Sequence, residues 1–325
     1  MKAINIQQFG TSEQLKLAER SIPNMQAHAV KVRVYAAGVN PSDVYTSTGT
    51  YAVVPELPYT PGLDGAGIVE EVGEAVTHVN VGDRVFIAAS TQGLCSGTFA
   101  QYIVCDAAFV HPLPAHITFE QGAALGIPAL TAYRALFDRA ELQQGQSVLI
   151  HGASGAVGLQ AVQMAKAAGA FVIGTASRTQ GKELVKATGA DVVLDHISAE
   201  NVEALRDATN GKGPDIIIEF LANVNLQTDV EVVAKRGVIV VIGNRGDITV
   251  NPRVMMQKEC DVRGMILWNA TADEYAALIK GVTTLLEEKV LQPVIGQAFP
   301  LEQAGAAFDA VMAGTYNGKI IVTID

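Results

Sequence analysis

The sequence has little cysteine, and this argues against two classes of protein. Cys95, Cys105 and Cys260 are the three cysteines among 325 residues, and they lie far apart in the chain. An odd number of scattered cysteines favours neither a disulfide framework nor a cysteine-rich zinc site. Isolated cysteines of this kind are typical of small buried apolar residues.

Long hydrophobic runs and an excess of basic charge are also missing. No apolar stretch reaches the roughly 20 residues that cross a bilayer, and the N-terminus has no signal-peptide core, so we expect a cytoplasmic protein without membrane contact. Lys and Arg number 23 against 33 Asp and Glu, a net charge of -10. That balance, without a Lys/Arg cluster or a stacking aromatic run, argues against nucleic acid as the main partner.

What the chain does contain is a strand–turn–helix–strand pattern over residues 147–174. A short apolar run at 148–150 is typical of a buried parallel strand, and a helical segment follows a turn rich in small residues. Gly155 and Gly158 fill the last two glycine positions of the dinucleotide fingerprint, and Ala153 stands at the first. Such a turn brings a pyrophosphate to a helix N-terminus, although a glycine-rich turn of another parallel α/β protein remains the alternative.

Strand and helix signals alternate around this unit. Hydrophobic patterning predicts strands at 147–151, 171–176, 192–195, 215–221, 237–242 and 261–267, with helices at 157–168, 180–188, 198–209 and 225–235. Six buried strands with helical crossovers predict a doubly wound, six-stranded parallel sheet of the Rossmann type, and hence the α/β class.

The two ends of the chain have a different pattern of residues. Residues 1–120 carry short β-branched runs divided by Gly and Pro, which predicts an irregular β-barrel domain. Thr118 is expected to cap a helical region that ends at Arg139. Helices are predicted at 273–289 and 301–312. A terminal strand at 319–324 has no helix after it, so we expect it to rejoin the N-terminal barrel.

The end of the second parallel strand bears on the choice of coenzyme. A site that prefers NAD usually has an acid there for the ribose 2′-hydroxyl, but this chain has Ser177 and Arg178, with Lys182 one turn onward. Because a guanidinium can pair with a 2′-phosphate, the pattern predicts NADPH over NADH. The alternative for Arg178 is an ordinary solvated loop charge.

Several segments go beyond a generic nucleotide-binding domain. They are 58–62, 151–159, 217–226, 240–246 and 250–253. Together they resemble the zeta-crystallin type of quinone oxidoreductase, a zinc-free branch of the medium-chain dehydrogenase/reductase superfamily. The resemblance covers nearly the whole chain. It implies a GroES-like catalytic domain from residues 1–122 and 268–325, a Rossmann NADP-binding domain from 123–267, and one NADPH per subunit.

The resemblance also implies site residues, position by position. Tyr51 matches a tyrosine beside the nicotinamide, although it could be an ordinary packing aromatic. The pyrophosphate turn is expected at Ser154, Gly155, Ala156, Val157 and Gly158. The ribose and 2′-phosphate are expected near Ser177, Arg178, Lys182 and His196, of which His196 could equally be a surface residue. Further coenzyme contacts are expected at Asn225, Ile242, Gly243, Asn244, Arg245 and Lys319.

Zinc-dependent relatives carry a cysteine and a Gly-His-Glu where this chain has Asn40 and Gly62-Leu63-Asp64. Asp43 and Asp64 alone make a poor zinc set, so we expect no metal. Quinone reduction yields a phenolate, which needs less stabilisation than an alkoxide. Asn40 and Tyr51 are the candidate catalytic residues, lining the acceptor site and donating hydrogen bonds to the developing oxyanion. The alternative for Asn40 is a turn-forming residue before Pro41.

The expected function is therefore zinc-independent, NADPH-dependent reduction of a quinone. Two alternatives stay open: reduction of α,β-unsaturated carbonyls by the same machinery, and an RNA-binding or structural role, which the resemblance also implies. The sixth parallel strand, 261–267, would lie at a sheet edge. The family pairs such edges across a two-fold axis, so we expect a homodimer or homotetramer.

Overall fold

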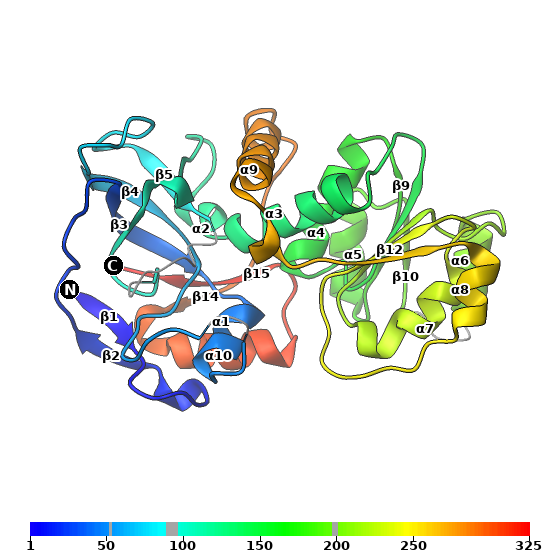
Figure 1. The fold of residues 1–325 in the computed structure, drawn as a ribbon, viewed down its shortest axis with the longest axis horizontal. Helices are drawn as coiled ribbons and strands as arrows, with labels where there is room; N and C mark the ends of the chain where they lie inside the picture. The colour runs from blue at the N-terminus through cyan, green and yellow to red at the C-terminus, as the bar shows by residue number, and fades with distance from the viewer. Residues whose placement is uncertain (52–53, 89–96, 197–200) are drawn as a thin grey trace. The chain divides into compact units, whose positions relative to one another are not determined.

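The computed structural model describes residues 1–51, 54–88, 97–196 and 201–325 (Figure 1). The contacts within it separate two compact units. Unit 1 comprises Met1–Ile127 and Pro293–Asp325, and unit 2 comprises Pro128–Gln292. Within the described residues, no helix combines the length and the apolar character that crossing a membrane requires.

Unit 1 is a β structure closed by both ends of the chain. Its main sheet has seven strands in the order β14-β15-β3-β4-β5-β7, with β6 also pairing with β3, and β1 and β2 form a separate pair. The strands are β1 (Lys2–Asn5), β2 (Lys16–Glu19), β3 (Ala29–Gly38), β4 (Asp64–Val72), β5 (Arg84–Ile87), β6 (Tyr102–Asp106), β7 (Val110–Pro112), β14 (Ile295–Pro300) and β15 (Lys319–Thr323). The helices are α1 (Pro41–Ser47), α2 (Phe119–Gly122) and α10 (Ala304–Ala313).

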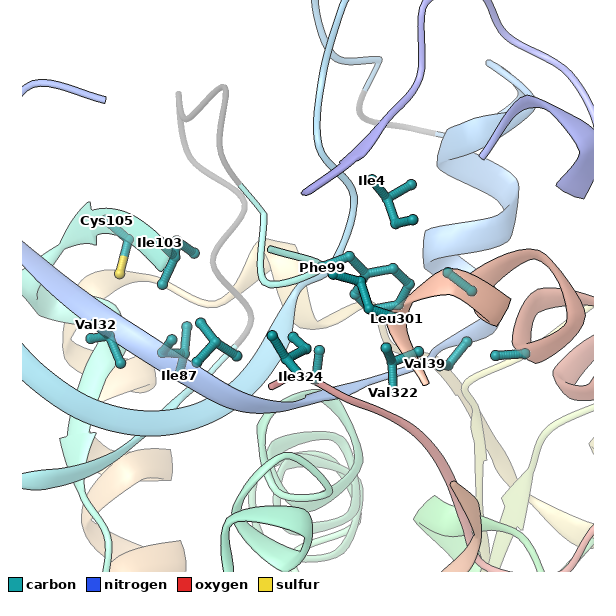
Figure 2. Packing of buried hydrophobic residues seen from close by; sticks show 14 of the residues in the cluster. Ile4, Val32, Val39, Ile87, Phe99, Ile103, Cys105, Leu301, Val322 and Ile324 are labelled. Carbon is teal, nitrogen blue, oxygen red and sulfur yellow. The ribbon is translucent and has the colours of Figure 1, made fainter. Parts of the chain in front are cut away.

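The terminal strand of the chain completes this sheet, as predicted. β15 pairs antiparallel with β3, with Ile321 opposite Gly38, and parallel with β14. The core between the elements joins distant segments: Ile4, Phe99, Leu301 and Val322 lie together in Figure 2. Cys105 is buried in the same cluster, which confirms the apolar role predicted for it. Cys95 lies outside the described residues.

Unit 2 carries the predicted doubly wound sheet. Its six strands are parallel, in the order β10-β9-β8-β11-β12-β13. They are β8 (Ser147–Ile150), β9 (Phe171–Thr175), β10 (Val192–Leu194), β11 (Ile216–Glu219), β12 (Val238–Val241) and β13 (Asp261–Gly264). The helices between them are α4 (Ala156–Ala167), α5 (Thr179–Ala187), α6 (Val202–Ala208), α7 (Ala222–Val232) and α8 (Pro252–Lys258).

The strand order explains where a ligand can bind. Helix α4 packs on β8 and β9, whereas α7 packs on β11 and β12. The order of the strands reverses between β8 and β11, and in open parallel sheets a crevice forms at that point, outside the carboxyl ends of the strands. The central strands are continuously apolar because helices cover the sheet, and Glu219 at the end of β11 is the buried exception.

The units divide the chain differently from the predicted domain boundaries. Helix α3 (Gly126–Tyr133) continues as a π-helix, Arg134–Arg139. The guanidinium of Arg134 donates to the carbonyls of Ile266 and Leu267 and pairs with Glu274 on α9 (Ala272–Glu287). The segment 268–292 belongs to unit 2 by its contacts, whereas the sequence led us to expect it in the GroES-like domain.

Candidate functional site

The nucleotide-binding residues predicted in unit 2 share one edge of its sheet. Ser154–Gly158 follow β8, Ser177 and Arg178 follow β9, and His196 follows β10. Asn225 lies in the first turns of α7 after β11, and Ile242–Arg245 follow β12. Because the strands are parallel, all these segments lie at the carboxyl edge of one sheet.

The glycine turn after β8 has the shape that a pyrophosphate requires. Gly152 adopts a φ of +50° and a side chain there would meet nothing within 4 Å, so the backbone is open on that side. At Gly158 a Cβ would lie 2.6 Å from the Cα of Ala153, so only glycine lets α4 pack this close to the turn. Helix α4 begins after Gly155, and the first amides of a helix have no intrahelical partner. Gly155 also has no side chain that could cap them. These features fit a bound diphosphate.

The end of β9 presents polar groups to solvent, as the sequence suggested. Ser177 and Arg178 are exposed, and Arg178 stands at the N-cap of α5. Lys182 on α5 forms an ion pair of 2.7 Å with Asp195, which the sequence analysis did not single out. His196 is exposed beside Asp195. Ser177, Arg178 and His196 therefore follow the adjacent strands β9 and β10, and Lys182 lies on α5 with an acidic partner.

The ends of β11 and β12 are tied together by backbone contacts. A Cβ on Gly243 would lie 2.2 Å from the carbonyl oxygen of Phe220, so glycine is required there. The amide of Arg245 donates to Oδ1 of Asn223 on α7, at 2.9 Å. Asn244 and Arg245 are exposed, and Ile242 is half-buried. The loop after β12 is thus fixed by its backbone, with two polar side chains left at the surface.

A buried acid–histidine cluster lies directly beneath these segments, and the sequence analysis missed it. It consists of His151, Glu219 and Asp229. A ring nitrogen of the histidine and one carboxylate oxygen of each acid all lie within 4.8 Å of one another. Nε2 of His151 is 2.9 Å from Oδ1 of Asp229 and 3.4 Å from Oε2 of Glu219. Glu219 and Asp229 are 0% exposed. Sequence patterns did not identify the cluster, because the three residues are separated by 68 and 10 positions and meet only when β8, β11 and α7 assemble.

The cluster holds its protons strongly. Burial, opposed by His151 and reinforced by Asp229, raises the pKa of Glu219 to about 7. Burial alone would lower the pKa of His151, but the hydrogen bond to Asp229 and the charges of both acids raise it above its ordinary value. Glu219 and His151 therefore keep their protons to higher pH than the same two groups would if they were exposed.

Unit 1 contains a second buried group of charges, the Lys319 cluster, formed by Asn40, Asp43, Asp64 and Lys319. Nζ of Lys319 donates to Oδ1 of Asn40 at 2.5 Å and lies 3.5 Å from Oδ2 of Asp64. The side-chain nitrogen Nδ2 of Asn40 donates to Oδ2 of Asp64 at 2.9 Å and to Oδ2 of Asp43 at 3.2 Å. Gly38 leaves room for the lysine, since a Cβ there would lie 2.8 Å from its Cε. The cluster joins α1, β4 and the last strand of the chain.

The pKa values of the Lys319 cluster follow from its burial. Burial, reinforced by the charge of Asp64, raises the pKa of Asp43 to about 7, although Lys319 opposes the shift. Burial also lowers the pKa of Lys319 below its ordinary value, against the opposing charges of Asp64 and Asp43. For both groups the cost of burying the charge is therefore larger than the stabilisation that the opposite charge supplies.

These bonds bear on two predicted site residues. Asn40 is the N-cap of α1, its backbone amide donates to Asp43 at 2.8 Å, and Pro41 follows at the first helical position. Both of its side-chain N–H groups point to carboxylates, so this arrangement favours a structural role over the oxyanion donor that we expected. Lys319 is 2% exposed and its ammonium donates to Asn40 in the cluster, and its predicted contact with the coenzyme stays a prediction.

Tyr51, the other catalytic candidate, is half-buried in unit 1. Its ring lies 6.2 Å from that of Tyr45 on α1, with an interplanar angle of 28°. This contact orients the ring, and the predicted role beside the nicotinamide stays a prediction.

Comparisons with known proteins agree with this fold. Family models match the chain as a zinc-binding dehydrogenase over residues 156–283 and as an alcohol dehydrogenase GroES-like domain over residues 26–115. A quinone oxidoreductase of Rattus norvegicus is 42% identical over 326 residues, covering 100% of this chain and 98% of the relative.

Two solved structures are also similar. The structure of Escherichia coli quinone oxidoreductase complexed with NADPH has a TM-score of 0.88 and 29% identity, covering 99% of this chain and 100% of that one. The structure of an NAD-dependent alcohol dehydrogenase has a TM-score of 0.91 and 27% identity, covering 100% of both chains.

Proposed function

Because this chain belongs to the quinone oxidoreductase family of the medium-chain dehydrogenase/reductase superfamily, we propose that it reduces quinones with NADPH. The observation that carries the proposal is the glycine turn after β8. An open backbone at Gly152 and a helix N-terminus after Gly155 form a diphosphate site at the switch point of the sheet.

The choice of NADPH rests on the residues after β9. Arg178 and Lys182 supply positive charge beside Ser177, and no acid stands at that strand end. A guanidinium pairs with a phosphate through two parallel hydrogen bonds, whereas the ribose hydroxyl of NADH offers no charge to pair with. Lys182 would exchange its partner Asp195 for the 2′-phosphate, or share its charge between the two.

The reaction requires little from the protein beyond aligning the coenzyme with the acceptor. NADPH supplies the hydride, and the residues of the chain hold its phosphates and orient the acceptor. Reduction places a negative charge on a conjugated phenolate oxygen, and the proton that completes the hydroquinone can come from water. Tyr51 is the candidate that donates a hydrogen bond to this oxygen, since the N–H groups of Asn40 are directed to Asp43 and Asp64.

We propose that no zinc takes part. The residues that stand where zinc-dependent relatives have cysteine and histidine are Asn40 and Leu63, neither of which offers a ligand of that kind. Asp64 accepts hydrogen bonds from Asn40 and from the amide of Ile127, and Lys319 supplies the neighbouring positive charge. Metal analysis of the purified protein tests this, and stoichiometric zinc required for activity would contradict it.

The function is tested by following NADPH oxidation against benzoquinones, naphthoquinones and α,β-unsaturated ketones. We expect quinones to give the highest kcat/KM and zinc chelators to have no effect. A higher kcat/KM with the enones would replace the quinone by an unsaturated carbonyl as substrate. No acceptor-dependent oxidation with any of them would contradict the proposal.

We also propose that the protein is a homodimer. Strand β13 lies at one end of the six-stranded sheet and pairs with β12 alone among the described strands. Its outer backbone groups are suited to pairing with the same strand of a second copy. Light scattering at micromolar concentration tests this, and a monomer would contradict it. A cytoplasmic location stays a prediction from the sequence.

A further inference from the structure

Glu219 connects the segments that are expected to hold the nucleotide. Its backbone carbonyl accepts from the amide of Ile242 at 2.8 Å, and the amide of Gly243 lies 3.4 Å away. Its side-chain Oε1 accepts from the amide of Leu221 and, at 3.3 Å, from Nδ2 of Asn225. Its second oxygen faces His151, the residue before Gly152. The buried carboxyl group of Glu219 therefore contacts the residues that follow β8 and β11, and the backbone of the same residue holds the end of β12.

The buried acid–histidine cluster is not satisfied by the hydrogen bonds of the described residues alone. Within that part of the chain, Nδ1 of His151, Oε2 of Glu219 and Oδ2 of Asp229 have no hydrogen-bond partner. Two carboxyl groups without further donors in a dry interior are unfavourable unless a proton or cation lies between them. A metal-binding histidine normally donates its other ring N–H to a second partner, which Nδ1 lacks among the described residues, so the geometry favours a proton.

The charge of the cluster depends on a single proton. With two titratable protons shared among the three groups its net charge is zero, and with one proton it is −1. The groups that face Glu219 are His151 after β8 and Asp229 on α7, while β12 contributes only backbone N–H groups. Loss of the second proton thus places an uncompensated negative charge under the turn that receives the phosphates.

We propose that Glu219 is a positioning residue of the nucleotide site, and that the cluster of His151, Glu219 and Asp229 takes up a proton when NADPH binds. This inference rests on the proposed function. Phosphates at the turn favour the neutral cluster, and the neutral cluster favours phosphates at the turn, because linkage is reciprocal. Burial raises the pKa of Glu219 to about 7, so the change falls near neutral pH and affinity for NADPH decreases as pH rises through about 7.

The test separates charge from hydrogen bonding at Glu219. In Glu219→Gln, the amide oxygen can still accept from Leu221 and Asn225, and the amide N–H can donate to Asp229, so the variant imitates the protonated state. Glu219→Ala removes both the acceptor for Leu221 and Asn225 and the donor to Asp229. Glu203→Gln, an exposed residue of α6, is the matched control. Thermal unfolding first establishes that each variant is folded.

Calorimetry of NADPH binding in two buffers of different ionisation enthalpy measures proton uptake. We expect uptake by the unmodified protein and by Glu203→Gln at about pH 7.5, and a smaller uptake by Glu219→Gln. The 2′-phosphate of NADPH also titrates in this range, but it is common to the titrations of all the proteins, so the difference isolates the cluster. Repeating the titration with NADH, which lacks the 2′-phosphate, removes that contribution.

The dissociation constants give a second readout. Between about pH 6 and pH 8.5, Kd for NADPH should rise about 3- to 10-fold more for the unmodified protein than for Glu219→Gln. A folded Glu219→Ala should bind NADPH about tenfold more weakly at all pH values, with KM for the quinone little changed.

Equal proton uptake and equal pH dependence in the unmodified protein and Glu219→Gln would overturn the inference while leaving the proposed function intact. Stoichiometric metal that is lost in Glu219→Gln would also overturn it. Failure of the unmodified protein to bind NADPH at all would overturn both.

Discussion

The ammonium of Lys319, in the last strand of the chain, lies 2.5 Å from the amide oxygen of Asn40, 279 positions earlier. The bond closes unit 1, since α1 and β4 come from the first part of the chain and β15 from its end. Lys319 also places one positive charge in a site that contains two buried carboxyl groups, Asp43 and Asp64. The two chain ends are thus held by a charge cluster as well as by strand pairing.

Replacing Lys319 by methionine, which keeps its length and removes its charge, should strongly destabilise unit 1. Asp64 and Asp43 would lose their buried counter-ion, and breaking such a buried pair costs about 3–5 kcal/mol. Urea denaturation measures the free energy of unfolding. The control is Lys31→Met, which breaks a partly exposed pair with Glu71 and should cost about 1 kcal/mol or less. Equal effects of the two changes would show that the cluster contributes little.

Asp43 should make unit 1 less stable as pH rises. Its pKa is raised in the folded chain to about 7 from a usual 3.8, so the folded state binds more protons between those values. The free energy of unfolding therefore falls with rising pH across that window, and the loss is complete above it. Asp43→Asn removes this contribution.

The stability of Asp43→Asn relative to the unmodified protein should accordingly increase by about 1 kcal/mol or more from about pH 5 to pH 8. Asp309→Asn, an exposed residue of α10, is the control and should show no such trend. Parallel pH profiles for Asp43→Asn and the unmodified protein would refute the assignment.

Arg178 should determine the preference for NADPH. Arg178→Ala removes the guanidinium expected to pair with the 2′-phosphate, so KM for NADPH should rise about tenfold or more while KM for NADH stays nearly constant. Steady-state kinetics with both coenzymes measures this. Arg236→Ala, an exposed arginine paired with Glu259, should leave the ratio unchanged. If Arg178→Ala also leaves it unchanged, Arg178 is an ordinary loop charge.

Tyr51→Phe should reduce activity only modestly. The ring and its contact with Tyr45 are kept, and one hydrogen-bond donor is lost, so kcat/KM for a quinone should fall by less than about 100-fold. Tyr45→Phe serves as the control for the ring contact. Complete loss of activity in a folded Tyr51→Phe variant would instead make Tyr51 an obligatory acid.

Patterns that are local in the sequence predicted much of the fold. The continuous apolar runs of β8, β11 and β12 identified buried parallel strands, with ends within about two residues of those observed. Thr118 caps α2 with a full capping box, as predicted, and the terminal strand joins β3 and β14. Short helices such as α1 and α8 escaped notice, because seven residues carry too little periodicity.

Local sequence patterns could not predict the two buried charge clusters. Asp43, Asp64 and Glu219 look like ordinary surface acids in the sequence, and their burial follows from which strands become neighbours. The sequence did not predict that the ammonium of Lys319 is hydrogen bonded to Asn40, and the contact expected between Lys319 and the coenzyme stays a prediction. Glu219 at the end of an otherwise apolar strand was the one available signal, since a charged residue there must find partners.

The central claim, that the glycine turn of unit 2 binds a phosphorylated pyridine nucleotide, is tested most directly by titrating the purified protein with NADPH in a calorimeter or by fluorescence. We predict saturable binding of one NADPH per chain, tighter than that of NADH, and weakened at least about tenfold by Gly158→Val, which places side-chain atoms where the backbone of Ala153 lies. No saturable uptake of NADPH by the folded protein would contradict the claim.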